Sequence, residues 1–137
     1  MARRSAQRLR RELVEELRAK GVIRSDPVEA AFLTVPRERF VPDVVAERGL
    51  EAVYRDEALV TKRDSRGMPL SSSSQPALMA EMLELLAPRP GDRVLEIGAG
   101  TGYNAALLTH LVGPKGHVTS VDVDAHELLA ALARRPG

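Results

Sequence analysis

Three glycines followed by an acidic residue have the types and the spacing of a nucleoside-binding site. Gly98, Gly100 and Gly102 form a G-x-G-x-G segment, and Asp122 follows Gly102 by twenty positions. Glycine lets a backbone approach a ligand closely, because it has no side chain and tolerates positive φ. A carboxylate at the end of the next strand can accept hydrogen bonds from ribose hydroxyls. The segment therefore predicts a binding loop, with Asp122 holding the sugar.

The sequence around the glycines predicts the strands and helices that must position them. Residues 93–97 form a short apolar run typical of a buried parallel strand, and residues 103–112 predict a helix. A turn at residues 113–116 precedes a second predicted strand, residues 117–121, which ends at Asp122. In a right-handed crossover the two strands lie side by side, so Asp122 and the glycine loop meet at one edge of the sheet. This order predicts the first β-α-β unit of a Rossmann-like α/β sheet.

The spacing of the glycines distinguishes two kinds of nucleoside ligand. Dinucleotide-binding folds favour G-x-G-x-x-G, whereas this loop has G-x-G-x-G and is preceded by Glu96. Residues 95–103 resemble the first motif of the class I S-adenosylmethionine-dependent methyltransferases. The resemblance implies that the loop accommodates the methionine portion of S-adenosylmethionine and that Asp122 holds its ribose. There are two alternatives. The fold binds a nicotinamide or flavin cofactor, or the glycines serve only a tight turn.

A run of serines precedes the predicted strand. Ser71 to Ser74 are followed by Gln75 and Pro76, and then by an apolar helical face within residues 78–86. Serine runs are often linkers, but here Pro76 can start a helix and Ser74 can cap it. We therefore expect the serines at a helix N-terminus, where free N–H groups can hold an anion.

Residues 1–70 predict a helical region that ends in a hairpin. The leucines that recur every four residues within 9–17 predict an amphipathic helix, and Ser25 followed by Pro27 predicts the start of another, residues 28–34. A third helix is predicted from about Asp43. The prolines that bracket residues 37–41 predict an extended or turn-rich connector. Two short strand candidates, residues 59–61 and 68–70, predict the hairpin.

Three blocks before the glycine loop resemble the N-terminal region of the protein-L-isoaspartate O-methyltransferases. They are residues 35–42, residues 54–59 and residues 74–76, and the resemblance extends from about residue 10 to the end of the chain. It implies methyl transfer from S-adenosylmethionine to the carboxylate of isoaspartyl or aspartyl residues in a protein or peptide. It implies Ser74 as the catalytic residue. It also implies a cofactor site made of Ser73, Gln75, Glu96, Gly98, Ala99, Gly100, Thr101, Gly102, Tyr103 and Asp122.

The sequence departs from that family in two places. Ser71, Ser72 and Ser73 stand where members usually have a glycine, a threonine and an aliphatic residue, and residues 61–67 form a longer and more charged connection. Both differences fall where a substrate would lie. A related enzyme that methylates aspartate in a particular peptide or natural-product precursor is therefore an alternative.

The composition argues against several other classes of protein. A net charge of +1 argues against nucleic-acid binding through overall charge. The first eleven residues are locally basic, so an RNA-binding arm or a targeting peptide is an alternative for that segment. No apolar run is long enough to span a bilayer. The absence of cysteine fits a reducing compartment and predicts a cytoplasmic location. The three histidines are scattered without carboxylates at metal-ligand spacing, so no metal site is predicted.

The family resemblance also predicts how much of the fold the chain contains. The methyltransferase sheet is larger than two strands, so we expect an incomplete Rossmann-like domain over residues 71–137, after the substrate-side region 1–70. A predicted helix from about Ala125 to Arg135 is the last element. The second class of function is therefore a non-catalytic fragment, or half of a split protein, that needs a complementing chain to supply the missing strands.

Overall fold

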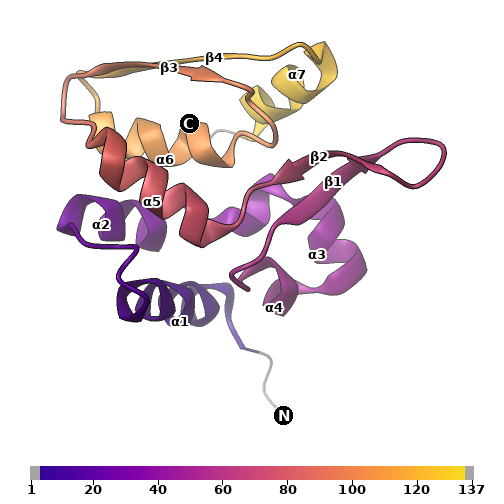
Figure 1. Ribbon diagram of the computed structural model, residues 1–137, viewed down its shortest axis with the longest axis horizontal. Helices are drawn as coiled ribbons and strands as arrows, with labels where there is room; N and C mark the ends of the chain where they lie inside the picture. The colour runs from indigo at the N-terminus through magenta and orange to yellow at the C-terminus, as the bar shows by residue number, and fades with distance from the viewer. Residues whose placement is uncertain (1–3, 135–137) are drawn as a thin grey trace.

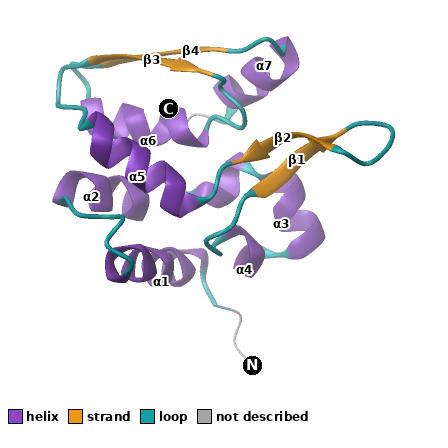
Figure 2. Ribbon diagram, in the orientation of Figure 1, coloured by secondary structure: helices purple, strands orange, loops and turns teal. Residues whose placement is uncertain are grey.

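Two small sheets and the helices around them make up residues 4–134, the part of the chain that the computed structural model describes (Figures 1 and 2). The fold class is the predicted one: a helical region and a hairpin come first, and a β-α-β unit follows. In chain order the elements are α1 (Ala6–Ala19), α2 (Asp26–Thr34), the 3₁₀ helix η1 (Arg37–Phe40), α3 (Pro42–Arg48), α4 (Leu50–Val53), β1 (Leu59–Arg63), β2 (Pro69–Ser73), α5 (Pro76–Leu86), β3 (Arg93–Ile97), α6 (Tyr103–Val112), β4 (His117–Val121) and α7 (Ala125–Ala133).

The first helices form where the apolar spacing and the proline predict them. The leucines of α1 lie on one buried face. Ser25 is the N-cap residue of α2, but its hydroxyl does not cap the helix. The carboxylate of Glu84 on α5 instead accepts hydrogen bonds from the amides of Arg24 and Ser25, both at 2.8 Å. The start of α2 is thus held by a side chain sixty residues away in the chain.

The connector after α2, predicted as extended or turn-rich, is a turn of 3₁₀ helix, η1. The space between Pro36 and Pro42 is too short for a long helix, but it accommodates the i→i+3 bond from the Arg39 amide to the Pro36 carbonyl, at 3.1 Å. This turn buries Arg37 and Phe40 completely. The packing of these two buried side chains therefore stabilises the 3₁₀ conformation.

The hairpin is longer than predicted and includes most of the serine run. β1 and β2 are antiparallel, and Leu59 pairs with Ser73 and Val60 with Ser72. The expectation that the serines lie at a helix N-terminus is therefore wrong for Ser71 to Ser73, which are strand residues. Ser74 does not cap α5 either, because the N-cap residue is Gln75 and its side chain makes no capping bond. Backbone pairing with β1 outweighs the local preference of serine for a cap.

The β-α-β unit has the predicted bounds. β3 and β4 are parallel and paired in register from Arg93 with His117 to Ile97 with Val121. Helix α6 packs against this pair, which lies at the edge of the molecule in Figure 1. On the other face, Leu95, Ile97 and Val121 have exposed fractions of 63%, 82% and 43%. Within the described residues, this sheet is covered on one side only.

The two parts of the chain share one hydrophobic core. The rings of Phe32 and Phe40 pack against Tyr103 at the start of α6, with centroids 6.4 and 5.8 Å apart. β2 runs across position 70, where the sequence predicts a division into two regions, and that division stays a prediction. None of the helices described is long and apolar enough to cross a bilayer.

Asp56 closes the start of α5 in place of a serine cap. Its side chain is 3% exposed, and it accepts hydrogen bonds from Lys20 Nζ at 2.7 Å and from the Ala77 amide at 2.8 Å. Burial alone would raise the pKa of Asp56, but these hydrogen bonds outweigh burial and lower it. The carboxylate therefore stabilises the fold in its ionised form.

We expect Asp56→Asn to lower the free energy of unfolding by about 2 kcal/mol at pH 7, because a buried charged acceptor is lost. The pKa of Asp56 is lower in the folded state than in the unfolded chain, where it is about 3.9. The stabilisation is thus fully present above roughly pH 4 and is lost as the pH falls through the folded-state pKa. Urea denaturation at pH 7 and pH 3 measures both effects.

Glu57 provides the matched control for Asp56. It forms an exposed ion pair with Arg48 at 2.9 Å, so Glu57→Gln should cost less than about 0.5 kcal/mol. Equal losses in the two variants, or a loss at Asp56 that persists unchanged at pH 3, would contradict the role given to Asp56.

Candidate functional site

The glycine loop and Asp122 meet at the carboxyl edge of β3 and β4, as the sequence predicts. Asp122 Oδ2 accepts hydrogen bonds from the amides of Ala99 at 2.9 Å and Gly100 at 3.2 Å, and the Gly98 amide donates to the Val121 carbonyl at 2.7 Å. Because amides hold the carboxylate, those of Asp124 and Gly100 first, the pKa of Asp122 lies below its ordinary value. Asp122 is therefore ionised at neutral pH.

Asp122 has little unused capacity to accept hydrogen bonds. Its Oδ1 accepts one from the Asp124 amide at 2.9 Å, in addition to the two that Oδ2 receives. An ionised carboxylate offers roughly four acceptor positions, so about one stays open. In this arrangement Asp122 can hold one ribose hydroxyl without releasing the loop.

Glycine is required in the loop for two different reasons. Gly98, Gly100 and Gly102 have φ values of +88°, +50° and +90°, which side chains disfavour. A Cβ on Gly98 would meet no atom within 4 Å, so its backbone lies open to a ligand. A Cβ on Gly102 would lie 2.9 Å from the Cβ of Ala131, so this glycine permits α7 to pack on the loop.

Glu96 and Thr101 make contacts inside the protein. Both oxygens of buried Glu96 are engaged, by Asn104 Nδ2 and by Ser120 Oγ, each at 2.8 Å. The Thr101 carbonyl accepts a hydrogen bond from Arg134 at 3.2 Å. Sequence reasoning missed Asn104, although its place in the first turn of the helix after the loop was a usable signal. Glu96 braces the sheet against α6, and its predicted contact with a cofactor stays a prediction.

The serine segment, residues 72–74, lies against the glycine loop. A Cβ on Gly100 would lie 3.9 Å from the Ser72 carbonyl oxygen. Ser73 is buried, whereas Ser74 is exposed, and its hydroxyl makes no hydrogen bond with the residues that the structure describes. Gln75 donates from Nε2 to the Asp56 carbonyl at 3.2 Å. The structure therefore brings Ser73 and Ser74 to the predicted site, while Gln75 is tied to the start of α5.

Two pockets open on either side of the glycine loop, and Gly98, Gly100 and Ser72 line both. The larger, about 650 Å³, is the serine pocket; it combines apolar residues of α5 and β3 with Ser72, Ser73, Ser74, Glu96, Gly98, Ala99, Gly100, Thr101, Tyr103 and Asn104. The smaller, about 380 Å³, is the aspartate pocket and includes Asp122, Lys62 and Ser71. An apolar wall with a few convergent polar groups is the usual form of a small-molecule site. Eight of the eleven predicted site residues line the serine pocket; Gln75, Gly102 and Asp122 do not.

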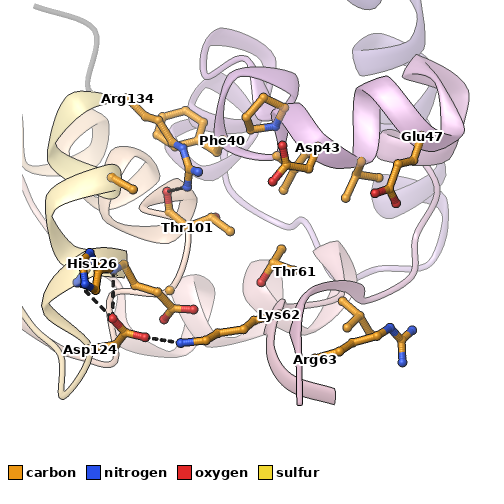
Figure 3. Close-up of a pocket in the computed structure, with 17 residues that line it drawn as sticks. Phe40, Asp43, Glu47, Thr61, Lys62, Arg63, Thr101, Asp124, His126 and Arg134 are labelled. Atoms are coloured by element: carbon orange, nitrogen blue, oxygen red, sulfur yellow. Dashed lines mark hydrogen bonds and ion pairs between the residues drawn. The ribbon is translucent and has the colours of Figure 1, made fainter. Parts of the chain in front are cut away.

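A third pocket, about 440 Å³, lies between α3, the hairpin and α7 (Figure 3). Thr101 and Arg134 meet on one side of it, Asp43 and Glu47 lie on the α3 side, and Lys62 pairs with Asp124 along its rim. Gly100 and Thr101 line it, so it adjoins the predicted cofactor site, although neither Asp122 nor Ser74 lines it. Across residues 4–134 no three His, Asp or Glu side chains are grouped so that they could hold a metal ion.

Comparison with known proteins identifies one family. The family model described as "Protein-L-isoaspartate(D-aspartate) O-methyltransferase" matches residues 7–135. A protein-L-isoaspartate O-methyltransferase of Methanopyrus kandleri is 45% identical over 115 residues, which are 84% of this chain and 46% of the relative. The enzyme of the same name from Thermotoga maritima is 46% identical over 114 residues, 83% of this chain and 34% of the relative. The chain thus spans half or less of the length of these curated relatives.

Solved structures support the same fold. One protein-L-isoaspartate O-methyltransferase superposes with a TM-score of 0.78 at 42% identity, over 91% of this chain and 37% of the other. A putative enzyme of this kind from Plasmodium falciparum, in complex with S-adenosyl-L-homocysteine, superposes with a TM-score of 0.73 over 90% of this chain and 53% of the other. At 20% identity the second match supports the fold alone.

Proposed function

Because the chain belongs to the protein-L-isoaspartate(D-aspartate) O-methyltransferase family, we propose that it carries the cofactor-binding part of an S-adenosylmethionine-dependent methyltransferase. The acceptor is the carboxylate of an isoaspartyl, or aspartyl, residue in a protein or peptide. The observation that carries the proposal is the contact between the glycine loop and the ionised carboxylate of Asp122. The serine segment beside that loop forms the side of the site that faces the methyl acceptor.

The residues present fit this cofactor. The open backbone at Gly98 and Gly100 admits the amino-acid portion, and Asp122 offers an acceptor to the ribose. The apolar wall of the serine pocket suits an uncharged thioether chain and a purine better than a phosphate. When bound, S-adenosylmethionine supplies a methyl group on a positively charged sulfur.

The residues of this chain orient the acceptor, and none of them has to remove a proton. A carboxylate is already ionised near neutral pH, so it attacks without a general base. Holding the reacting oxygen in line can contribute roughly 7 to 11 kcal/mol in favourable cases. The hydroxyl of Ser74, exposed and free of partners among the described residues, is the donor that can hold the carboxylate.

Binding and transfer test the proposal separately. Calorimetry with S-adenosylmethionine and S-adenosylhomocysteine is expected to show binding to one site per chain. Two peptides that differ only in carrying isoaspartate or aspartate at one position then compare transfer of a labelled methyl group. Transfer to the isoaspartyl peptide supports repair-type specificity, and transfer to the aspartyl peptide alone supports the related-enzyme alternative. A folded chain that binds neither nucleoside would contradict the proposal.

We also propose a partner chain that supplies further strands to the sheet. The exposed face made by Leu95, Ile97 and Val121 is of the kind that α/β folds cover, and the match takes up only 46% and 34% of the two curated relatives. The test is to mix the chain with the C-terminal half of the Methanopyrus relative and to measure co-elution and cofactor affinity. Association that Leu95→Lys abolishes supports this partner, and no association argues against it.

We propose a cytoplasmic location and a peptide partner on the basis of composition. The absence of cysteine is consistent with a cytoplasmic enzyme. A net charge of +1 favours a peptide partner over a nucleic acid.

A further inference from the structure

Arg37 is the most unusual side chain near this site. It is completely buried, and it is among the largest side chains that are. Its Nη2 donates to the Ser74 carbonyl at 3.1 Å and lies 3.5 Å from Ser73 Oγ, while Nε and Nη1 have no partner among the described residues. Buried polar groups nearly always have a partner, so two unused donors on one guanidinium require an explanation.

The charge of Arg37 is unpaired as well. Within residues 4–134 no carboxylate lies close enough to form an ion pair with it, and its guanidinium carbon lies 5.5 Å from the centre of the Tyr103 ring. Burial lowers the pKa of Arg37, yet a guanidinium keeps its proton near neutral pH. The carboxylates of Asp56 and Glu57 favour the charged form from beyond ion-pair distance, and a buried charge without a paired counter-ion is costly to the fold. The fold bears that cost beside the candidate active site.

We propose that Arg37 is a positioning residue of this site, which fixes the serine segment and whose charge is balanced by the carboxylate of a ligand in the serine pocket. The inference rests on the proposed function. The three residues that Arg37 contacts, Ser73, Ser74 and Tyr103, all line that pocket. Arg37 thus lies directly behind the pocket wall, where low polarity lets a charge act over several ångströms.

Two ligands can supply the carboxylate: the amino-acid end of the cofactor or the acceptor residue. Arg37→Met removes the charge at similar volume, and Arg39→Met on the exposed side of η1 is the matched control. Calorimetry compares S-adenosylhomocysteine with its decarboxylated analogue, which keeps the amine. If the cofactor is the source, Arg37→Met lowers affinity for the first by about tenfold or more and leaves the second within about twofold.

If the acceptor is the source, both nucleosides bind Arg37→Met as they bind the wild type. The KM for the isoaspartyl peptide then rises about tenfold or more, while kcat changes less. Arg37→Lys keeps the charge and should recover part of the lost affinity in either case. Equal weakening of both nucleosides, or no change in affinity and KM, would overturn the proposal.

Hydrogen exchange tests the positioning role without any ligand. The amides of residues 74–77 are expected to exchange faster in Arg37→Met than in the wild type or in Arg39→Met, because the Ser74 carbonyl loses its donor. If Arg37→Met does not fold, Arg37→Lys serves for the same measurement. Unchanged exchange overturns the role of Arg37 and leaves the proposed function intact, whereas a wild-type chain that binds no nucleoside contradicts the function itself.

Discussion

Asp122→Ala is expected to weaken binding of S-adenosylhomocysteine by about 100-fold. A hydrogen bond to a charged acceptor contributes roughly 1.5 to 3 kcal/mol, and about 2.7 kcal/mol corresponds to 100-fold in affinity. The variant loses the proposed contact with the ribose. It also releases the amides of Ala99 and Gly100, which the carboxylate holds in the loop. Calorimetric titration of the folded variant measures the loss.

Asp92 is the matched control for this variant. It is an exposed aspartate at the opposite edge of the same sheet, and its carboxylate likewise accepts a hydrogen bond from a backbone amide, that of Arg89 at 2.8 Å. Asp92→Ala should therefore leave affinity for the nucleoside within about twofold of the wild type. If the two variants bind equally well, the aspartate at the loop does not contact the ligand.

Asp122→Asn separates the two roles of the carboxylate. Asparagine keeps one acceptor for the loop amides but places an NH₂ group where the second oxygen was. If Asp122 contributes to affinity mainly by ordering the loop, Asp122→Asn binds S-adenosylhomocysteine nearly as well as the wild type. If Asp122 contributes to affinity mainly through the negative charge that faces the ribose, Asp122→Asn binds almost as weakly as Asp122→Ala.

The β-α-β unit could be predicted from sequence because its signals are local. The bounds of β3 and β4 follow from their apolar runs, and the end of the helix between them follows from the glycines there. The order of these elements then brings Asp122 to the glycine loop. Nothing outside residues 93–122 was needed to place this half of the site.

The serine segment could not be predicted in the same way because its conformation depends on distant residues. The pairing of Ser72 and Ser73 with β1, and the capping of α5 by Asp56, override what serine and proline favour locally. In the sequence Arg37 is one residue of a predicted connector, and only the fold places it behind the pocket. Charge, burial and contact with Ser74 are properties of the packed chain and not of the pattern around Arg37.

The two halves of the site therefore differ in what maintains them. The loop and Asp122 hold each other through backbone amides, so that half depends on few side chains. The other half, where the methyl acceptor is proposed to lie, depends on the side chain of Arg37 in η1, which contacts the Ser74 carbonyl and the Tyr103 ring. If the proposed roles hold, we expect substitutions in residues 61–74 to affect the choice of methyl acceptor more than the binding of the cofactor.

The strongest test of that separation is Ser74→Ala, which is expected to lower methyl transfer about 100-fold while nucleoside affinity stays within about threefold. Removing one preorganised donor from a developing reaction centre typically costs 100- to 1,000-fold in rate. The Ser74 hydroxyl makes no bond within the described residues, so its loss should not disturb the fold. Transfer to the isoaspartyl peptide is measured with the chain and, if transfer requires it, the complementing half.

Ser65→Ala, at the exposed tip of the hairpin, controls for the loss of a hydroxyl on the same hairpin. Ser74→Thr keeps a donor and should retain more activity than Ser74→Ala. If Ser74→Ala transfers methyl groups at the wild-type rate, the acceptor is oriented by another donor. The backbone amides of the serine segment are then the next donors to test, because the bond from Arg37 to the Ser74 carbonyl holds this segment whether or not the hydroxyl is present.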